Sequence, residues 1–184
     1  MNVATIVRPE EPGDYAQIRE MTIPAFKAAY GTGEAEADLI ERLRAQPDHD
    51  PALALVAVQG ALVVGHILFS PVIIRGEAGE WPALCLAPLG VRIGYQRQGI
   101  GSALLRAGLA RARERGHSRL VLSGDPAYYG RFGFGDAQSH GLRDDLGTPP
   151  PHFLALALAE GALAGVSGLV CYSPPFDVFR PTNS

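Results

Sequence analysis

The chain has 184 residues, of which 47% are hydrophobic and 19% charged, a globular composition that excludes a disordered chain. The formal net charge of −3 gives no reason to expect nucleic-acid binding. The longest apolar runs are far shorter than the roughly 18–20 residues of a membrane span, so no transmembrane helix is expected. This length predicts one domain over residues 1–184, with its core at about 4–172 and an irregular tail at 173–184.

The two cysteines and the N-terminal sequence indicate the compartment. No basic flank leads into an apolar run at the N-terminus, so a secretory signal is not expected. Cys85 and Cys171 each lie in an apolar run, the usual place of a buried thiol in a reducing compartment. No further Cys and no suitably spaced His accompanies them, so we expect no metal site. The sequence therefore predicts a cytoplasmic protein.

Positive charge is concentrated between Arg92 and Arg119, where seven arginines accompany one acid, Glu114. Lys27 is the one lysine among 16 basic residues, so part of this pattern reflects a composition bias toward arginine. A solvated helix face and an anion-binding role explain the arginine segment equally well.

The first predicted elements are a strand at 4–8 and a helix from about residue 15, with Asp14 as its N-cap candidate. Pro24 is expected to bend or end this helix. A second helix is predicted over about 34–45, where apolar residues recur at helical spacing.

Strands dominate the middle of the chain. The β-rich runs 53–59 and 62–70 are separated by a tight turn, which predicts an antiparallel hairpin. A third run at 82–92 contains Pro88 and Gly90. A proline and a glycine inside a strand indicate a bulge or a splayed edge.

The second half begins with the longest amphipathic stretch, which predicts a helix over about 99–116. A short strand at 118–123 and a short helix at 124–129 follow. Two final strands are predicted at 153–159 and 167–172. This order predicts an α/β or α+β domain with a mixed sheet and one parallel crossover, through the long helix.

The segment that joins the irregular strand to the long helix, Arg92–Ala103, suits a phosphate or pyrophosphate. A glycine-bearing loop before a helix presents free backbone N–H groups and the positive end of the helix dipole. Ile100-Gly101 stands where a P-loop needs Lys-Ser/Thr, and Leu104 replaces the third glycine of the dinucleotide fingerprint. The chain also lacks the Gly-x-Ser-x-Gly elbow of a hydrolase.

The pattern that fits is Gln96-x-x-Gly99-x-Gly101, which resembles the pyrophosphate loop of the GCN5-related N-acetyltransferases, the GNAT family. Tyr129-Gly-Arg-Phe-Gly-Phe134 is similar to that family's Tyr-x-x-x-Gly-Phe segment after the fifth strand. Cys85–Arg92 and Ser123–Phe134 further resemble its YhbS-like branch, whose substrates are mostly unassigned. The resemblance implies the GNAT-like α/β fold, a mixed, mostly antiparallel seven-stranded sheet with helices on both faces and a splayed cofactor cleft between the fourth and fifth strands.

The resemblance also implies acetyl-CoA as cosubstrate. Its pantetheine arm would pair with the backbone of the irregular strand at Leu89, Gly90 and Val91, where an N–H group would stabilise the oxyanion. Its pyrophosphate would bind the backbone of the loop and first helical turn, namely Gln96, Arg97, Gln98, Gly99, Ile100, Gly101 and Ser102. The alternative for the irregular strand is an ordinary β-bulge, and the alternative for the loop is a turn that binds no ligand.

Tyr129 matches the family tyrosine that protonates the departing CoA thiolate. A phenol, whose ordinary pKa is about 10, stays protonated at neutral pH and suits this role. The alternative is an aromatic packing cluster with Tyr128, Phe132 and Phe134.

The family takes its general base from a carboxylate or His at no fixed position, and the candidates are His66 and Glu80. A hydrogen-bonded core role is the favoured interpretation of His66, and a non-catalytic role that of Glu80. The acidic pairs Glu10-Glu11 and Asp144-Asp145 are expected to be solvated.

The resemblance thus predicts an acetyl-CoA-dependent N-acetyltransferase that moves acetyl directly to a primary amine in a ternary complex. The acceptor would be a small-molecule or peptide amine, in a groove formed by the first two helices and the loop between the last strands. Neither nucleic acid nor membrane is an expected partner, and a homodimer is compatible with the sequence. The alternative is a non-catalytic CoA-binding sensor or interaction protein on the same fold.

Overall fold

The computed structural model of the chain describes residues 4–181, which form two compact units. Unit 1 contains the residues up to Ser70 together with Ala87–Arg111, and unit 2 contains Pro71–Leu86 and the residues from Ala112 onward. Each unit therefore combines two separate stretches of chain. The expected single domain stays a prediction, which one cooperative unfolding transition would support.

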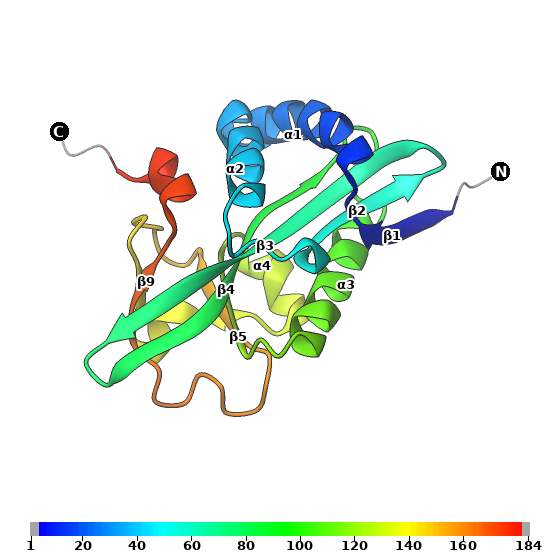
Figure 1. The fold of residues 1–184 in the computed structure, drawn as a ribbon. Helices are drawn as coiled ribbons and strands as arrows, with labels where there is room; N and C mark the ends of the chain where they lie inside the picture. Colours follow the sequence, from blue (N-terminus) through cyan, green and yellow to red (C-terminus); the bar gives the residue numbers. More distant parts are fainter. Residues whose placement is uncertain (1–3, 182–184) are drawn as a thin grey trace. The chain divides into compact units, whose positions relative to one another are not determined.

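Two helices form one layer of unit 1. Helices α1 (Tyr15–Tyr30) and α2 (Glu34–Arg44) lie side by side (Figure 1). Pro24 lies inside α1, which continues to Tyr30, so the proline does not end the helix. Asp14 precedes α1 as expected but makes no side-chain cap. Its carboxylate accepts hydrogen bonds from Arg8 and from the backbone N–H of Glu11 instead.

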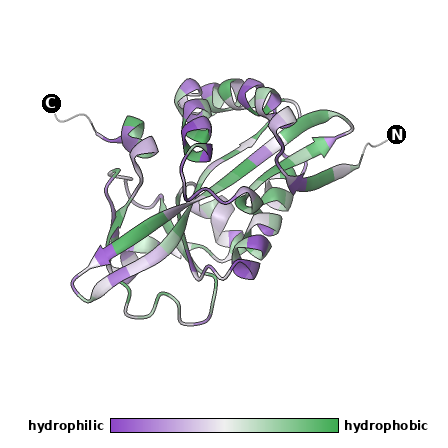
Figure 2. Ribbon diagram, in the orientation of Figure 1, coloured by the Kyte–Doolittle hydropathy of each residue, from purple (hydrophilic) through white to green (hydrophobic). Residues whose placement is uncertain are grey.

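The sheet of unit 1 contains β1 (Thr5–Pro9), β2 (Ala54–Gln59), the first part of β3 (Leu62–Gly76) and the last part of β4 (Gly79–Val91). They lie in the order β1-β2-β3-β4. Strands β2 and β3 form the expected antiparallel hairpin, whose register shifts between Ala57 and Val58. Figure 2 shows hydrophobic residues along most of β2 and β3. The side chains of β2 and of the first part of β3 are buried in the core of unit 1.

Helix α3 (Ile100–Glu114) packs against β3 within unit 1, as far as Arg111. Two glycines permit this approach. A Cβ on Gly108 would lie 2.3 Å from Phe69 Cε2, and one on Gly65 would lie 2.8 Å from Leu104 Cδ1. The start of α3 is thereby fixed on the sheet of unit 1.

In unit 2 the first part of β4 pairs in parallel with β5 (Arg119–Ser123), at Leu84 and Leu120, which confirms the predicted crossover. Strand β5 pairs antiparallel with β8 (Phe153–Ala157), and β8 pairs with β6 (Gly135–Asp136). The short helix α4 (Pro126–Tyr129) follows β5.

A second group of strands completes unit 2. Strand β9 (Gly168–Cys171) pairs antiparallel with the end of β3 and in parallel with β7 (Leu142–Asp144). The described chain thus has nine strands where seven were expected. Strands of two or three residues, such as β6 and β7, are too short to show an alternating pattern. Single-turn 3₁₀ helices lie at Pro12–Asp14, Pro51–Leu53, Gly130–Phe132 and Ala137–His140, and a longer one at Pro174–Phe179.

The mixed α/β class and the mostly antiparallel sheet pairings agree with the sequence prediction. Cys85 is buried and Cys171 half-buried, and both are free thiols. Burial raises the pKa of the Cys85 thiol, which makes it unreactive at neutral pH. Within residues 4–181, no helix combines the length and the apolar content that crossing a bilayer requires.

Candidate functional site

The loop between β4 and α3 has an unusual backbone. Gly94 and Gly99 have φ values of 87° and 81°, a left-handed conformation that glycine adopts without strain. Arg97 shares this conformation, with φ 59°, and is the one non-glycine residue in the described chain that does so. Such backbone strain in a non-glycine residue is concentrated at functional sites.

The loop is held in this shape by its own side-chain amides. Gln96 Nε2 donates to the carbonyl of Val91 at 3.2 Å, and Gln98 Nε2 donates to that of Gly94 at 3.1 Å. Both side chains thereby brace the loop and leave its outer backbone exposed. Gln96 of the motif and Gln98 within it consequently have a structural role that the motif spacing alone did not reveal.

The first turn of α3 is suited to an anion. Its first helical hydrogen bond runs from the N–H of Ala103 to the carbonyl of Gly99 at 2.9 Å, so the N–H groups of Ile100 and Gly101 have no partner within the helix. The turn carries no acidic residue that would compete for these groups. Ile100 is only 3% exposed and anchors the turn in the core of unit 1. Of the expected pyrophosphate residues, Gln96 to Gly99 are thus exposed, Gly101 and Ser102 are half-buried, and Ile100 is buried.

The end of β4 lies against α1. A Cβ on Gly90 would be 3.2 Å from Phe26 Cε2 and 3.3 Å from Met21 Cε, so the glycine allows close packing under α1. Leu89, Gly90 and Val91 therefore belong to unit 1 with the loop.

Arg92 fixes the exit from β4. Its Nε donates to the carbonyl of Val63 at 2.8 Å, and its Nη1 pairs with Glu20 Oε1 at 2.9 Å. Its backbone N–H also bonds to the carbonyl of Val64. Arg92 thus ties the start of the loop to β3 and α1, and no local pattern in the sequence indicates these partners.

Tyr129 lies in unit 2, at the end of α4. Asp125 caps this helix by accepting a hydrogen bond from the N–H of Ala127. The Tyr129 ring contacts Tyr128 and Phe134 edge to face, with ring centroids 4.9 and 5.7 Å apart. It also lies over Gly124, where a Cβ would come within 2.4 Å of Tyr129 Cε2. The packing role and the proposed acid role of Tyr129 are therefore compatible, because the aromatic cluster fixes the orientation of the Tyr129 ring.

The two base candidates lie in different units and different environments. His66, on β3 in unit 1, is 1% exposed, and its Nε2 lies 2.8 Å from Glu10 Oε2. Glu80, near the start of β4 in unit 2, is exposed and pairs with Arg75 at 3.0 Å. Glu10 itself is buried, so its expected solvation is wrong.

The described residues contain no group of three His, Cys, Asp or Glu side chains that could hold a metal ion. The residues expected to bind the cofactor all belong to unit 1, together with His66. Tyr129 and Glu80 belong to unit 2.

Known proteins resemble nearly the whole chain. The model of the acetyltransferase (GNAT) domain matches residues 7–137. The uncharacterized N-acetyltransferase YhbS of Escherichia coli K12 is 37% identical over 175 residues, which are 95% of this chain and 99% of that protein. YjhQ of the same strain, also an uncharacterized N-acetyltransferase, is 34% identical over 77% of this chain and 73% of its own length.

Two solved structures are similar over 96% of this chain, each with 34% identity. The crystal structure of YhbS from Escherichia coli in complex with CoA has a TM-score of 0.83 and is covered over 94% of its length. That of a GNAT family acetyltransferase from Brucella melitensis in complex with acetyl-CoA has a TM-score of 0.76 and is covered completely, at 100%.

Proposed function

The chain belongs to the GNAT acetyltransferase family, and from this premise we propose that it transfers the acetyl group of acetyl-CoA directly to a primary amine in a ternary complex. The observation that carries the proposal is the braced, left-handed loop that opens the acid-free first turn of α3. Two similar proteins were crystallised with CoA and acetyl-CoA, which supports the same cosubstrate here.

The residues of unit 1 fit this cosubstrate. The backbone from Gln96 to Ser102 would hold the pyrophosphate, because exposed N–H groups at a helix start favour a phosphate. Leu89, Gly90 and Val91 would offer N–H and C=O groups to the pantetheine arm, and an N–H there would polarise a carbonyl oxygen. When bound, acetyl-CoA supplies an activated thioester carbonyl.

Tyr129 is proposed as the general acid. Its hydroxyl would donate a proton to the departing thiolate sulfur, and its aromatic neighbours would orient the ring for that step.

We propose that the general base is either Glu80 or His66. A different observation supports each of the two. Glu80 is accessible, whereas His66 has an Nδ1 atom without a hydrogen-bond partner in the described chain but is sealed in the core. Replacing each by Gln and following kcat/KM over pH assigns the role. A general base must be deprotonated to act, so loss of the acidic limb of the profile in one variant alone identifies that residue.

The acceptor, the assembly and the location are also proposals. A small-molecule or peptide amine fits the family, and light scattering would test for a homodimer. A cytoplasmic location is supported by the two free thiols, Cys85 and Cys171, which are typical of a reducing compartment.

Titration calorimetry with acetyl-CoA tests the proposal, and dephospho-CoA serves as the comparison ligand. We expect saturable binding at one site that Gly99→Ala weakens at least tenfold. Gly116→Ala is the matched control, because Gly116, just after α3, has φ 82° and equally open surroundings. Absence of binding at millimolar acetyl-CoA, or equal weakening by both variants, would contradict the proposed loop site.

The second candidate function is a CoA-binding sensor without turnover. The same calorimetry would then show binding, whereas no amine would be acetylated by the wild-type protein.

A further inference from the structure

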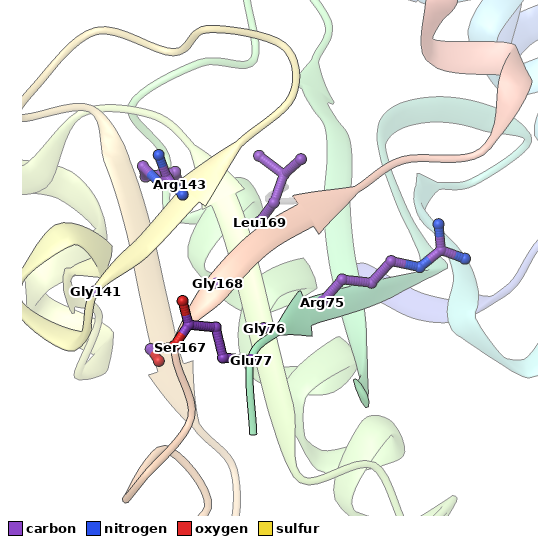
Figure 3. Close-up of a pocket in the computed structure, with 8 residues that line it drawn as sticks. All are labelled: Arg75, Gly76, Glu77, Gly141, Arg143, Ser167, Gly168 and Leu169. Carbon is purple, nitrogen blue, oxygen red and sulfur yellow. The ribbon is translucent and has the colours of Figure 1, made fainter. Parts of the chain in front are cut away.

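Unit 2 contains a cavity of about 540 Å³ that the proposed acetyl transfer does not use (Figure 3). It lies where the end of β3 and the starts of β7 and β9 meet. Its lining residues are Arg75, Gly76, Glu77, Gly141, Arg143, Ser167, Gly168 and Leu169. This volume falls within the roughly 300–1,000 Å³ of pockets that bind small molecules.

Glycines leave part of the lining as bare backbone. A Cβ on Gly76 would lie 2.1 Å from the carbonyl oxygen of Ser167, and one on Gly168 would lie 2.1 Å from that of Arg75. Gly168 also has φ 138°. The two glycines therefore let the main chains of β3 and β9 approach each other closely at the cavity wall.

Strand register arranges the side chains above this backbone. Arg75 on β3 is opposite Leu169 on β9, and Leu169 is opposite Arg143 on β7. Direct cross-strand partners project on the same face of a sheet, so Leu169 lies between the two arginines. In Figure 3, however, the Arg75 side chain extends away from the other labelled residues.

The charges of the cavity are only partly neutralised. Arg75 is engaged by Glu80 at 3.0 Å. Arg143 and Glu77 are both exposed, and neither forms an ion pair or a side-chain hydrogen bond with any residue between 4 and 181. The cavity therefore presents one cation and one anion that are not paired with each other, beside the half-buried Leu169.

We propose that this cavity binds a small zwitterion, with a carboxylate and an ammonium group on an apolar body. The Arg143 guanidinium binds the carboxylate through its planar pair of donors, and Glu77 accepts from the ammonium group. The apolar body packs on Leu169. Free apolar amino acids and short apolar peptides share this chemistry. The site does not depend on acetyl transfer.

Calorimetry without acetyl-CoA tests the site directly. The probes are leucine, leucyl-leucine, its N-acetyl derivative and its C-terminal amide. We expect saturable binding of leucine or leucyl-leucine, and the stronger of the two identifies the ligand size. Either blocked peptide is expected to bind at least tenfold more weakly than leucyl-leucine, because one charged hydrogen-bond partner is missing. If neither leucine nor leucyl-leucine binds at about 10 mM, the proposal is overturned. A weaker affinity than this would be too low for a functional small-molecule site.

Two variants assign each charge to its partner. Arg143→Gln is expected to weaken leucyl-leucine at least tenfold but to leave the weak binding of the amide unchanged, and Glu77→Gln to do the same for the N-acetyl peptide. Arg42→Gln and Glu160→Gln are matched exposed controls outside the cavity and should bind like the wild type. If either cavity variant binds leucyl-leucine as tightly as the wild type, the proposal is overturned. Acetyl-CoA binding stays intact in all four variants, which separates this test from that of the proposed function.

Discussion

Glu10 and His66, 56 residues apart in the sequence, meet inside unit 1, with 2.8 Å between Glu10 Oε2 and His66 Nε2. Arg44, at the end of α2, holds the same carboxylate, with Nε 2.6 Å from Oε1 and Nη2 2.9 Å from Oε2. Burial alone would raise the pKa of Glu10, but the hydrogen bonds from His66 and Arg44 lower it to about 2. The Arg44 guanidinium also lies 3.9 Å from the ring centre of Tyr15 on α1.

His66 is neutral in this cluster. Complete burial lowers its pKa and outweighs the opposing effect of Glu10. Its Nδ1 is buried and has no hydrogen-bond partner in the part of the chain that the structure describes. A second ring proton would therefore be an unsatisfied donor in the core, so the proton lies on Nε2 and is donated to Glu10.

Replacing Glu10 by Gln should destabilise the protein strongly. The change leaves the Arg44 cation, whose side chain is 10% exposed, without its carboxylate. Removing one member of a buried ion pair costs about 3–5 kcal/mol. Urea unfolding of the wild type and variant measures this loss. Glu41→Gln is the control, since that carboxylate is 53% exposed, and it should leave the midpoint unchanged. Equal effects of the two changes would contradict a special role for the buried carboxylate.

Stability should fall as the pH drops below about 6.5, the ordinary pKa of His. Because the folded-state pKa of His66 is lowered, the unfolded chain binds a proton there that the folded chain does not, and stability is lost as pH falls. The slope from this one proton is at most about 1.4 kcal/mol per pH unit. A further loss follows between about pH 4.5 and pH 2 from Glu10. Urea unfolding at pH 7.5 and 5.5 measures the first step, and His66→Gln should remove its contribution. An unchanged slope in that variant would mean that another group causes it.

Tyr129→Phe should slow acetyl transfer without loss of acetyl-CoA affinity. General acid catalysis contributes about 10²–10⁴-fold to a rate, and only the hydroxyl is removed. The ring contacts with Tyr128 and Phe134 remain. Steady-state kinetics with a reactive amine, combined with calorimetry, separates rate from binding. Tyr128→Phe is the control in the same cluster, and an equal loss in both variants would favour a packing role.

Gly108→Ala should destabilise the protein, although alanine favours helices over glycine by about 1 kcal/mol. The added methyl group would lie 2.3 Å from Phe69 Cε2 and 2.5 Å from its Cζ. Overpacking of a core costs about 1–3 kcal/mol, which outweighs the helix preference. Thermal unfolding checks the sign. Adding Phe69→Leu should restore part of the loss, and a stabilised single variant would show that α3 can move away from β3.

Local patterns predicted the regular part of this fold. The β2–β3 hairpin, helix α3 and the parallel pairing of β4 with β5 follow from periodicity and turn residues that lie within the elements themselves. The alternation of strands and helices then left few topologies open. The loop that we propose for the cofactor was predicted in the same way, because its glycines occur at a fixed spacing before a helix.

Features that depend on distant partners were missed. Glu10 has the sequence surroundings of a surface acid, and its partners lie 34 and 56 residues away. The left-handed backbone of Arg97 has no signature in residue type, since arginine rarely adopts it. The pairing of β9 with β3 joins a short strand to the end of a long one across about a hundred residues of chain, beyond the reach of any local pattern.

The single lysine of the chain lies in the exposed last turn of α1. This protein belongs to a family that acetylates amines. It therefore has just one lysine side chain that its own active site, or an amine-reactive label, could modify. Peptide mapping by mass spectrometry after incubation with acetyl-CoA would consequently locate self-acetylation of a lysine at one position and separate it from acetylation of the α-amino group. A fluorophore coupled to Lys27 would likewise report from one known position, next in sequence to Phe26, which packs against Gly90.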